Sequence, residues 1–280
     1  MSRIVRTSSS GWAVVGEQGS APLGGSLGDL LALPLDEARR RVTAAASETA
    51  ASATAADPDD LLAPVDEQEV WAAGVTYQRS REGRVEESGA AALYTAVYEA
   101  QRPELFFKSL PSRVVADGEP VGIRADSGWD VPEAELGLVV NSRGEIFGYV
   151  VGNDMSSRSI EGENPLYLPQ AKIYERACSL SSGIVPAWEA GDGPFDISVR
   201  IVRSGATVWE AADSTARMHR QLTDLVDWLL RAMDFPRGVG LLTGTGLVPD
   251  REVTLQEGDV IAIEVSGIGT LSNPVVVVGR

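Results

Sequence analysis

Cysteine and histidine are almost missing from this chain of 280 residues, which contains one of each, Cys178 and His219. One cysteine cannot close an intramolecular disulfide or supply a cysteine-rich zinc site, so nothing indicates an oxidising compartment. One histidine excludes zinc sites with two or more histidine ligands, and a Ser-His-Asp triad would depend on His219 alone. Any acid–base or metal chemistry must therefore be carried mostly by carboxylates and lysines.

Basic residues and long apolar runs are also scarce. The 24 lysines and arginines face 40 aspartates and glutamates, which gives a formal net charge of −16. This charge repels phosphates and anionic lipid surfaces, so neither nucleic acid nor a membrane is an expected partner, although it can help to gather a cation. The longest apolar runs reach about five residues, far from the roughly 20 that cross a bilayer. No targeting pattern is visible, and the chain is expected in the cytoplasm.

The remaining pattern is typical of a strand-rich fold with few helices. Strand-like runs lie at 70–75, 105–108, 134–140, 146–151, 197–202, 207–209, 260–265 and 275–278. Helices are expected at 35–46, 84–100 and about 219–233. The absence of a βαβ alternation favours an α+β fold with a mostly antiparallel or mixed sheet. We place a boundary near residue 65, between a small N-terminal domain (1–65) and a larger domain (66–280).

The first candidate site is a pair of glutamates, Glu133 and Glu135, two residues apart in a predicted strand. Such residues share one face, where Gly137 is expected to leave space, and adjacent carboxylates repel unless a cation lies between them. The hairpin turn NSRGE returns a second strand toward Asp154, which can supply a third oxygen ligand. Three carboxylates describe a hard-cation site for Mg²⁺, or alternatively Mn²⁺ or Ca²⁺. The other interpretation is an exposed strand edge with two solvated glutamates.

Two further segments offer polar groups. The stretch SSRSIEGENPLYLPQAKIYERACS contains Arg158 and Lys172 and is too irregular for regular structure; long polar loops that return to a sheet end are often functional. A lysine here can bind an anionic substrate or act as an acid or base, unless it is a plain surface lysine. The turn TGTG at 243–246 includes Thr245, and its amides and hydroxyls can hold a carboxylate, unless it is only a tight turn.

Taken in order, these segments resemble the fumarylacetoacetate hydrolase family over about residues 70 to 278. The matching pieces are GVTY, RPELFFK, the strand with the two glutamates, GYVVGNDMSSR, LPQAK and LLTGTG. The resemblance implies a mixed β-roll and a Mg²⁺ site formed by Glu133, Glu135 and Asp154. It also implies a homo-oligomer, a homodimer or homotetramer.

One stretch departs from the hydrolases of that family. Their C–C hydrolases resemble G-x-N-Y-x-x-H, in which the histidine pairs with a glutamate to activate water, whereas this chain has GVTYQRS with Ser80 in place of the histidine. The stretches GVTYQRS, RPELFFK and SSRSIEGENPLYLPQAK instead resemble the sequences of the dehydratase branch of the family. That branch converts 2-keto-3-deoxy-D-arabinonate or 2-keto-3-deoxy-D-xylonate to 2,5-dioxopentanoate in non-phosphorylating pentose oxidation.

The resemblance also implies roles for individual residues. A 2-keto acid is the expected small-molecule partner; it chelates Mg²⁺ through its carboxylate and ketone oxygens, which acidifies the C3 hydrogens. Lys172 or Glu104 is then the base that takes the C3 proton while the C4 hydroxyl leaves. Substrate contacts are expected from Arg79, Ser80, Lys108, Arg158 and Thr245. Two alternatives stay open: another metal-dependent hydrolase or isomerase of the family, acting on an acylpyruvate-type 2-keto acid, or a non-catalytic protein that binds a cation or a carboxylate.

Overall fold

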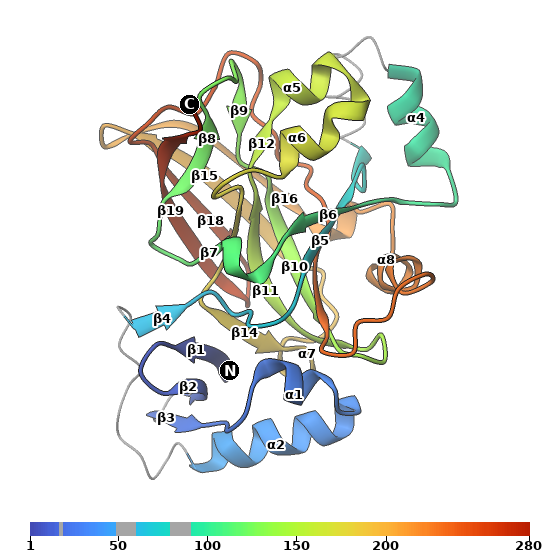
Figure 1. The fold of residues 1–280 in the computed structure, drawn as a ribbon, viewed down its shortest axis with the longest axis vertical. Coiled ribbons are helices and arrows are strands. Elements are labelled where there is room, and N and C mark those ends of the chain that lie inside the picture. The colour runs from blue at the N-terminus through green and yellow to red at the C-terminus, as the bar shows by residue number, and fades with distance from the viewer. Residues whose placement is uncertain (17–18, 49–59, 79–90) are drawn as a thin grey trace.

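The computed structural model describes residues 1–16, 19–48, 60–78 and 91–280 (Figure 1). The strands are β1 Arg3–Thr7, β2 Gly11–Gly16, β3 Gly19–Pro22, β4 Leu61–Leu62, β5 Val70–Gly74, β6 Glu104–Ser109, β7 Val114–Val115, β8 Val121–Arg124, β9 Asp130–Val131, β10 Ala134–Val140, β11 Ile146–Asp154, β12 Ser156–Ser157, β13 Cys178–Leu180, β14 Gly183–Pro186, β15 Asp196–Arg203, β16 Ala206–Ser214, β17 Val239–Leu242, β18 Val260–Val265 and β19 Gly269–Val278. The helices are α1 Leu27–Leu31, α2 Leu35–Glu48, α4 Ala91–Glu99, α5 Arg158–Glu163, α6 Leu168–Lys172, α7 Ala187–Ala190 and α8 Leu222–Leu229, with 3₁₀ turns η3 Pro111–Arg113, η4 Pro165–Tyr167 and η5 Thr215–Arg217.

The strands form a large mixed sheet, a second sheet and a short pair. The 12-stranded sheet has the main order β3-β2-β1-β14-β11-β10-β17-β5-β6, and the five-stranded sheet has the order β16-β15-β18-β19-β8. Most neighbours are antiparallel, but β17 runs parallel to β5, β19 to β8 and β13 to β7. The predicted strand-rich α+β fold with a mixed sheet is therefore confirmed.

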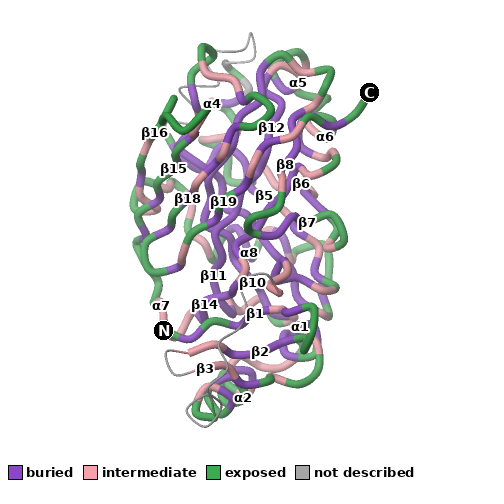
Figure 2. The backbone as a smooth tube through the Cα atoms, turned by 90° about the vertical axis from the view of Figure 1, so that its left-hand side faces the viewer, coloured by how far each residue is buried: buried purple, intermediate pink, exposed green. Residues whose placement is uncertain are grey.

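The two larger sheets enclose one main core. Alternate residues of β10, among them Leu136 and Leu138, pack in a buried cluster with Val199 of β15, Ile263 of β18 and Leu271 of β19. Figure 2 shows this buried backbone running through the middle of the molecule. The period-two alternation of β10 explains the arrangement, because successive side chains of a strand point to opposite faces.

Most predicted elements are present, with shifted ends. β10 and β18 have the predicted bounds, whereas β11, β15, β16 and β19 are longer than expected. Of the helix predicted at 84–100, residues 84–90 lie outside the described residues, and α4 covers 91–99. The hairpin turn between β10 and β11 has Gly144 at φ +79°, the left-handed conformation that glycine adopts at no steric cost. None of the described helices has the length and apolar character to cross a membrane.

The segment after β12 is not the irregular loop that the sequence suggested. It contains the short helices α5 and α6, joined by η4. Ser157 caps α5 by accepting a hydrogen bond from the amide of Ile160, and Asn164 caps η4 by accepting one from the amide of Leu166. A proline in the first turn of α6 loses no helical hydrogen bond there. The capping residues and prolines, rather than hydrophobic periodicity, define these helices.

The N-terminal strands are joined to the large sheet. Ile4 and Val5 of β1 pair with Ile184 and Gly183 of β14, and Ile4 shares a buried cluster with Phe147 of β11. Figure 1 shows β1–β3, α1 and α2 at one end of the molecule, opposite α4, α5 and α6. Backbone hydrogen bonds and a shared core thus connect the N-terminal part to the rest of the molecule. The division into a small domain over residues 1–65 and a larger one stays a prediction.

Candidate metal centre

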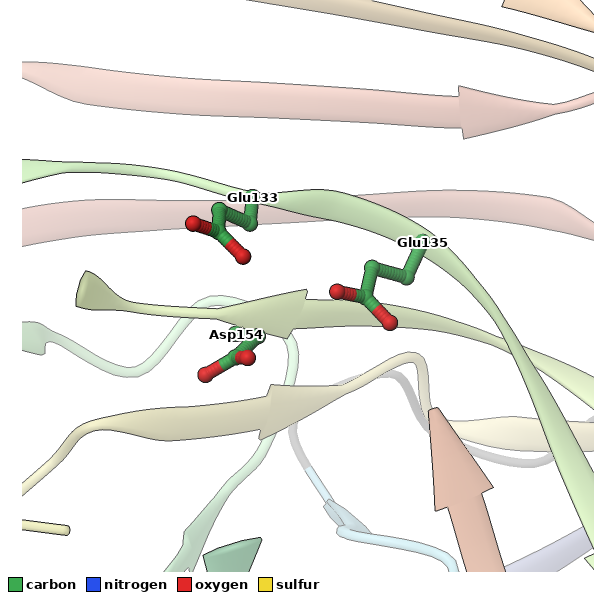
Figure 3. A group of neighbouring side chains, drawn as sticks. All are labelled: Glu133, Glu135 and Asp154. Carbon is green, nitrogen blue, oxygen red and sulfur yellow. The ribbon is translucent and has the colours of Figure 1, made fainter. Parts of the chain in front are cut away.

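Glu133, Glu135 and Asp154 converge where β10 begins and β11 ends. The antiparallel register pairs Glu135 with Gly152, and the amide of Asp154 donates to the carbonyl of Glu133 at 3.0 Å. One carboxylate oxygen from each of the three lies within 4.8 Å of those of the others, and Figure 3 shows the side chains pointing toward one another. All three residues are at most 3% exposed, so the alternative of a solvated strand edge is wrong.

The charge of this cluster fits a bound cation. Burial, followed by the carboxylates of Asp154 and Glu133, raises the pKa of Glu135 well above its usual value. Buried like charges repel in this way unless a cation lies between them. Oxygen ligands without sulfur or imidazole are the set that Mg²⁺ prefers. The three residues therefore fit a hard divalent ion.

Lys172, at the end of α6, lies directly against the acidic cluster. Its Nζ donates to Glu133 Oε2 at 2.7 Å, to Asp154 Oδ2 at 2.9 Å and to Ser156 Oγ at 2.6 Å. The residue is 1% exposed, and the amine lies 5.7 Å from the centre of the Phe106 ring. The structure thus brings a predicted acid–base lysine to the predicted metal ligands.

Lys108, on β6, contacts the same cluster from another direction. Its Nζ donates to the backbone carbonyls of Met155 at 2.9 Å and Lys172 at 2.6 Å, and it forms an ion pair with Asp154 Oδ1. These bonds connect the end of β11 to the end of α6. The hydrogen bonds of Lys108 fix the backbone of the site, and its contact with substrate stays a prediction.

Arg158, at the start of α5, lies between two buried carboxylates. Its Nη1 is 3.0 Å from Glu161 Oε2 and 3.5 Å from Glu133 Oε1, and its guanidinium lies 5.6 Å from the Trp129 ring centre. Glu161 was not among the predicted residues. The only sequence signal for it is its position three residues after Arg158, which places both on one helix face, and the segment was not expected to be helical.

The TGTG turn contacts the cluster through its backbone. The amide of Gly244 donates to Glu135 Oε2 at 2.6 Å, and Thr76 Oγ1 donates to the carbonyl of Thr243 at 2.7 Å. A Cβ on Gly244 would lie 2.1 Å from Thr76 Oγ1, and its φ is +90°. The hydroxyl of Thr245 accepts a hydrogen bond from the amide of Leu247 at 2.9 Å, which closes the turn. An amide of this turn does hold a carboxylate, but that of the protein's own Glu135.

Gly137 does not leave space next to the glutamates. A Cβ there would lie 2.7 Å from Val150 Cγ2 and 3.3 Å from Leu242 Cδ2. The expectation of open space was wrong, because side chains of the neighbouring strands β11 and β17 fill it.

The other predicted residues have different positions. Glu104, the first residue of β6, lines a hollow of about 420 Å³ together with Glu161, Pro165 and Leu168. Arg79 and Ser80 lie outside the described residues. His219 is exposed and stacks on Tyr98 with ring centroids 4.4 Å apart, as expected of a surface histidine. Cys178 is buried, and burial raises its thiol pKa to about 12, in keeping with a structural role.

The sequence of the chain is similar to those of known proteins. Residues 69–276 match the family described as fumarylacetoacetate (FAA) hydrolase C-terminal. The chain belongs to this family. Among its relatives, a probable 2-keto-3-deoxyxylonate dehydratase of Haloferax volcanii is 52% identical over 216 residues, 77% of this chain and 74% of the relative. The 2-dehydro-3-deoxy-D-arabinonate dehydratase of Saccharolobus solfataricus is 42% identical over 221 residues, with the same coverage.

Solved structures agree with the family assignment. A 2-keto-3-deoxy-D-arabinonate dehydratase complexed with magnesium and 2,5-dioxopentanoate superposes with a TM-score of 0.81 at 31% identity, covering 100% of this chain and 99% of that one. The predicted membership in the fumarylacetoacetate hydrolase family is confirmed.

Proposed function

We propose that this family member is a Mg²⁺-dependent dehydratase that converts a 2-keto-3-deoxy-pentonate, of the D-arabinonate or D-xylonate type, to 2,5-dioxopentanoate and water. The observation that carries the proposal is the buried carboxylate cluster with the amine of Lys172 against it, 2.7 Å from Glu133 Oε2. The supporting relatives are named as dehydratases of these two sugar acids. The reaction removes a proton from C3 and the hydroxyl from C4 as water. The resulting 5-hydroxy-2-oxopent-3-enoate loses a proton from C5 and regains one at C3, and the enol so formed relaxes to the aldehyde of 2,5-dioxopentanoate. The atoms of the products therefore balance those of the substrate.

Each residue of the cluster has a role in this proposal. Mg²⁺ held by Glu133, Glu135 and Asp154 would supply Lewis-acid polarisation of the keto acid. Lys172 holds a proton beside these ligands, and a lysine amine can act as a base when its pKa is lowered. Glu104 is the second candidate proton carrier. We propose that one of the two takes the C3 proton and the other protonates the leaving hydroxyl.

The position of the single histidine supports dehydration over hydrolysis. A hydrolase of this family would need a base that activates water, and His219 is exposed and stacked on Tyr98. Dehydration needs no attacking water, so it does not require that base. A C–C hydrolase or isomerase acting on another 2-keto acid remains the second candidate, since the same carboxylate cluster would serve it.

The test is an assay of the purified protein with 2-keto-3-deoxy-D-pentonate, first with Mg²⁺ and then with EDTA. An NAD(P)-linked semialdehyde dehydrogenase reports 2,5-dioxopentanoate. A signal that EDTA abolishes supports the proposal, and replacement of Mg²⁺ by Mn²⁺ or Ca²⁺ tests the choice of metal. Two organic fragments in place of one product would identify a hydrolase. Metal binding without turnover of any 2-keto acid would leave the binding-protein alternative.

The proposal includes three points that rest on the sequence and on family resemblance. These are a cytoplasmic location, assembly as a homodimer or homotetramer, and a small N-terminal domain over residues 1–65. Light scattering on the purified protein measures the oligomeric state directly, and a monomer at micromolar concentration would contradict the second point.

A further inference from the structure

A hollow is lined by residues of α4, by the first residue of β6 and by residues of the α5–α6 segment. Its volume, about 420 Å³, falls within the range of small-molecule pockets. Its apolar wall includes Tyr94, Val97 and Leu168, and its acidic wall consists of Glu104 and Glu161. The proposed reaction uses Glu104 as a proton carrier and gives no role to Glu161.

Side chains of β6 connect the hollow to the metal centre. Glu104 and Phe106 are alternate residues of this strand and share one face, whereas the pairing with β5 shifts register at Lys108. Lys108 pairs with Asp154, Phe106 lies under the Lys172 amine, and Glu104, next on the same face, lines the hollow. A chain that leaves the carboxylate cluster along this face therefore reaches Glu104.

A second connection runs through α5. Arg158 Nη1 contacts both Glu133 of the carboxylate cluster and Glu161 of the hollow, at 3.5 and 3.0 Å. One guanidinium nitrogen thus separates the two carboxylates. Glu161 is 3% exposed, and its bond to Arg158 fixes its carboxylate in place. A five-carbon 2-keto acid would be held at the cluster by its C1 carboxylate and C2 ketone oxygens. Its other three carbons would then extend beyond the cluster.

We infer that this hollow receives the distal end of the 2-keto acid, and that Glu161 selects a neutral, hydroxyl-bearing end over an anionic one. The inference rests on the proposed function for the chelated head of the substrate. A carboxylate accepts a hydrogen bond from a hydroxyl, and this charge-assisted bond is stronger than one between neutral groups. A distal carboxylate or phosphate would instead meet the like charges of Glu104 and Glu161.

The charge balance of the described lining residues favours the same choice. Among these, Arg102 is the only cation. Arg158, behind the lining, is shared by Glu161 and Glu133, so two carboxylates face one guanidinium. Glu104 adds a further negative charge. Arg102 is exposed, and its guanidinium lies 4.6 Å over the Trp228 ring. A solvated arginine that stacks on an aromatic ring contributes little to holding an anion inside the hollow. Tyr94, Val97 and Leu168 offer contact surface to the carbon chain of the substrate.

The experiment uses three 2-keto acids with five-carbon backbones that differ only at C5: 2-oxopentanoate, 5-hydroxy-2-oxopentanoate and 2-oxoglutarate. None carries a C4 hydroxyl, so none can be dehydrated, and calorimetry with saturating Mg²⁺ measures binding alone. We expect the hydroxy acid to bind about tenfold more tightly than 2-oxopentanoate, and 2-oxoglutarate to bind about tenfold more weakly. Ratios within one variant cancel changes in metal affinity, because all three ligands share the same chelating head.

Glu161→Gln should reduce both preferences at least about threefold. Glu163→Gln is the matched control, because Glu163 is exposed on the same helix and the substitution removes the same charge. The ratios of the three binding constants in this variant should equal those of the wild type. Equal binding of the three ligands, tighter binding of 2-oxoglutarate, or unchanged ratios in Glu161→Gln would overturn the inference. The wild-type ligand series remains decisive if the variant does not fold.

These outcomes are independent of turnover. The expected binding order without dehydratase activity would refute the proposed function and leave the selectivity of the hollow standing. Dehydratase activity with equal binding of the three ligands would refute the selectivity alone.

Discussion

Lys108 and Lys172 both reach Asp154, but their other contacts differ. Lys172 donates to the side chains of Glu133 and Ser156, whereas Lys108 donates to two backbone carbonyls. A side chain among carboxylates can exchange a proton with a substrate, while one bonded to carbonyls fixes the backbone. At the residue scale, the two lysines should therefore be separable by mutation.

Lys172→Met should lower turnover by about a hundredfold or more, the usual contribution of a proton-transfer group. Mg²⁺ should still bind, because a positive charge leaves the ligand cluster. Lys108→Met is the comparison: we expect a loss of about 2–4 kcal/mol in the free energy of unfolding, since a buried carboxylate and two carbonyls lose their donor. The coupled assay, calorimetry and urea unfolding measure these effects. Full turnover of Lys172→Met with bound Mg²⁺ would exclude Lys172 as acid or base.

Asp130 provides a prediction on pH. Burial raises its pKa from 3.8 to about 6, so folding disfavours the ionised form. The contribution of protonated Asp130 to the free energy of unfolding is therefore fully present below about pH 4 and is lost as the pH rises through 6. Asp130→Asn should therefore be more stable than the wild type by about 1–3 kcal/mol at pH 8, with a smaller gain at pH 5.

Asp126 is the control with the opposite sign. Its hydrogen bonds with Arg124 lower its pKa, so its contribution is present above about pH 4 and is lost as the pH falls. Asp126→Asn should not stabilise the protein at pH 8. Urea unfolding at both pH values measures both variants, and a gain for Asp130→Asn that grows toward low pH would contradict the assignment.

At the scale of single elements, the predicted strands and the turn between β10 and β11 followed the sequence pattern, whereas the connection after β12 did not. β10 alternates strictly between two faces, so its bounds could be predicted, as could the shared face of Glu135 and of Glu133 just before the strand. α5 and α6 have only 6 and 5 residues, too few to show a helical period. Their main signals are the Ser157 cap of α5 and the proline in the first turn of α6. The role of the TGTG turn depends on a strand more than a hundred residues earlier in the chain.

Gly244→Ala tests that turn. Its φ of +90° and the 2.1 Å approach to Thr76 Oγ1 leave no room for a methyl group. We expect a loss of about 2 kcal/mol or more in stability and weaker Mg²⁺ binding, because the amide that orients Glu135 is displaced. Gly128→Ala is the control, since Gly128 is exposed and has nothing within 4 Å of its Cβ position. It should change stability by less than about 0.5 kcal/mol, and equal effects of the two variants would contradict the prediction.

At the scale of the whole molecule, the N-terminal strands and the large sheet share a core. Ile4 pairs with Ile184 and is fully buried beside Phe147. Ile4→Ala should cost about 2–4 kcal/mol and shift a single cooperative unfolding transition. Val208→Ala, at a residue 41% exposed, should shift it little. Calorimetry that shows two transitions, of which Ile4→Ala moves only one, would contradict this cooperativity and show that the proposed N-terminal domain unfolds independently.

The sequence by itself determined the kind of chemistry and part of the site. A single histidine and a single cysteine left oxygen ligands as the available set, and the period of two placed Glu133 and Glu135 on one face. The ordered motifs were sufficient to indicate the family. These conclusions depend on composition and on interactions between neighbours in the chain, which the sequence contains directly.

The tertiary structure alone decided which distant groups meet at the site. Lys172 is 39 residues from Glu133, and Gly244 is 109 residues from Glu135, yet both donate hydrogen bonds to these carboxylates. The link from Glu133 through Arg158 to Glu161 likewise needs α5 to be helical and to lie beside β9 and β12. Local backbone preferences act over a few residues, whereas such contacts exist only once the sheets have closed around a common core.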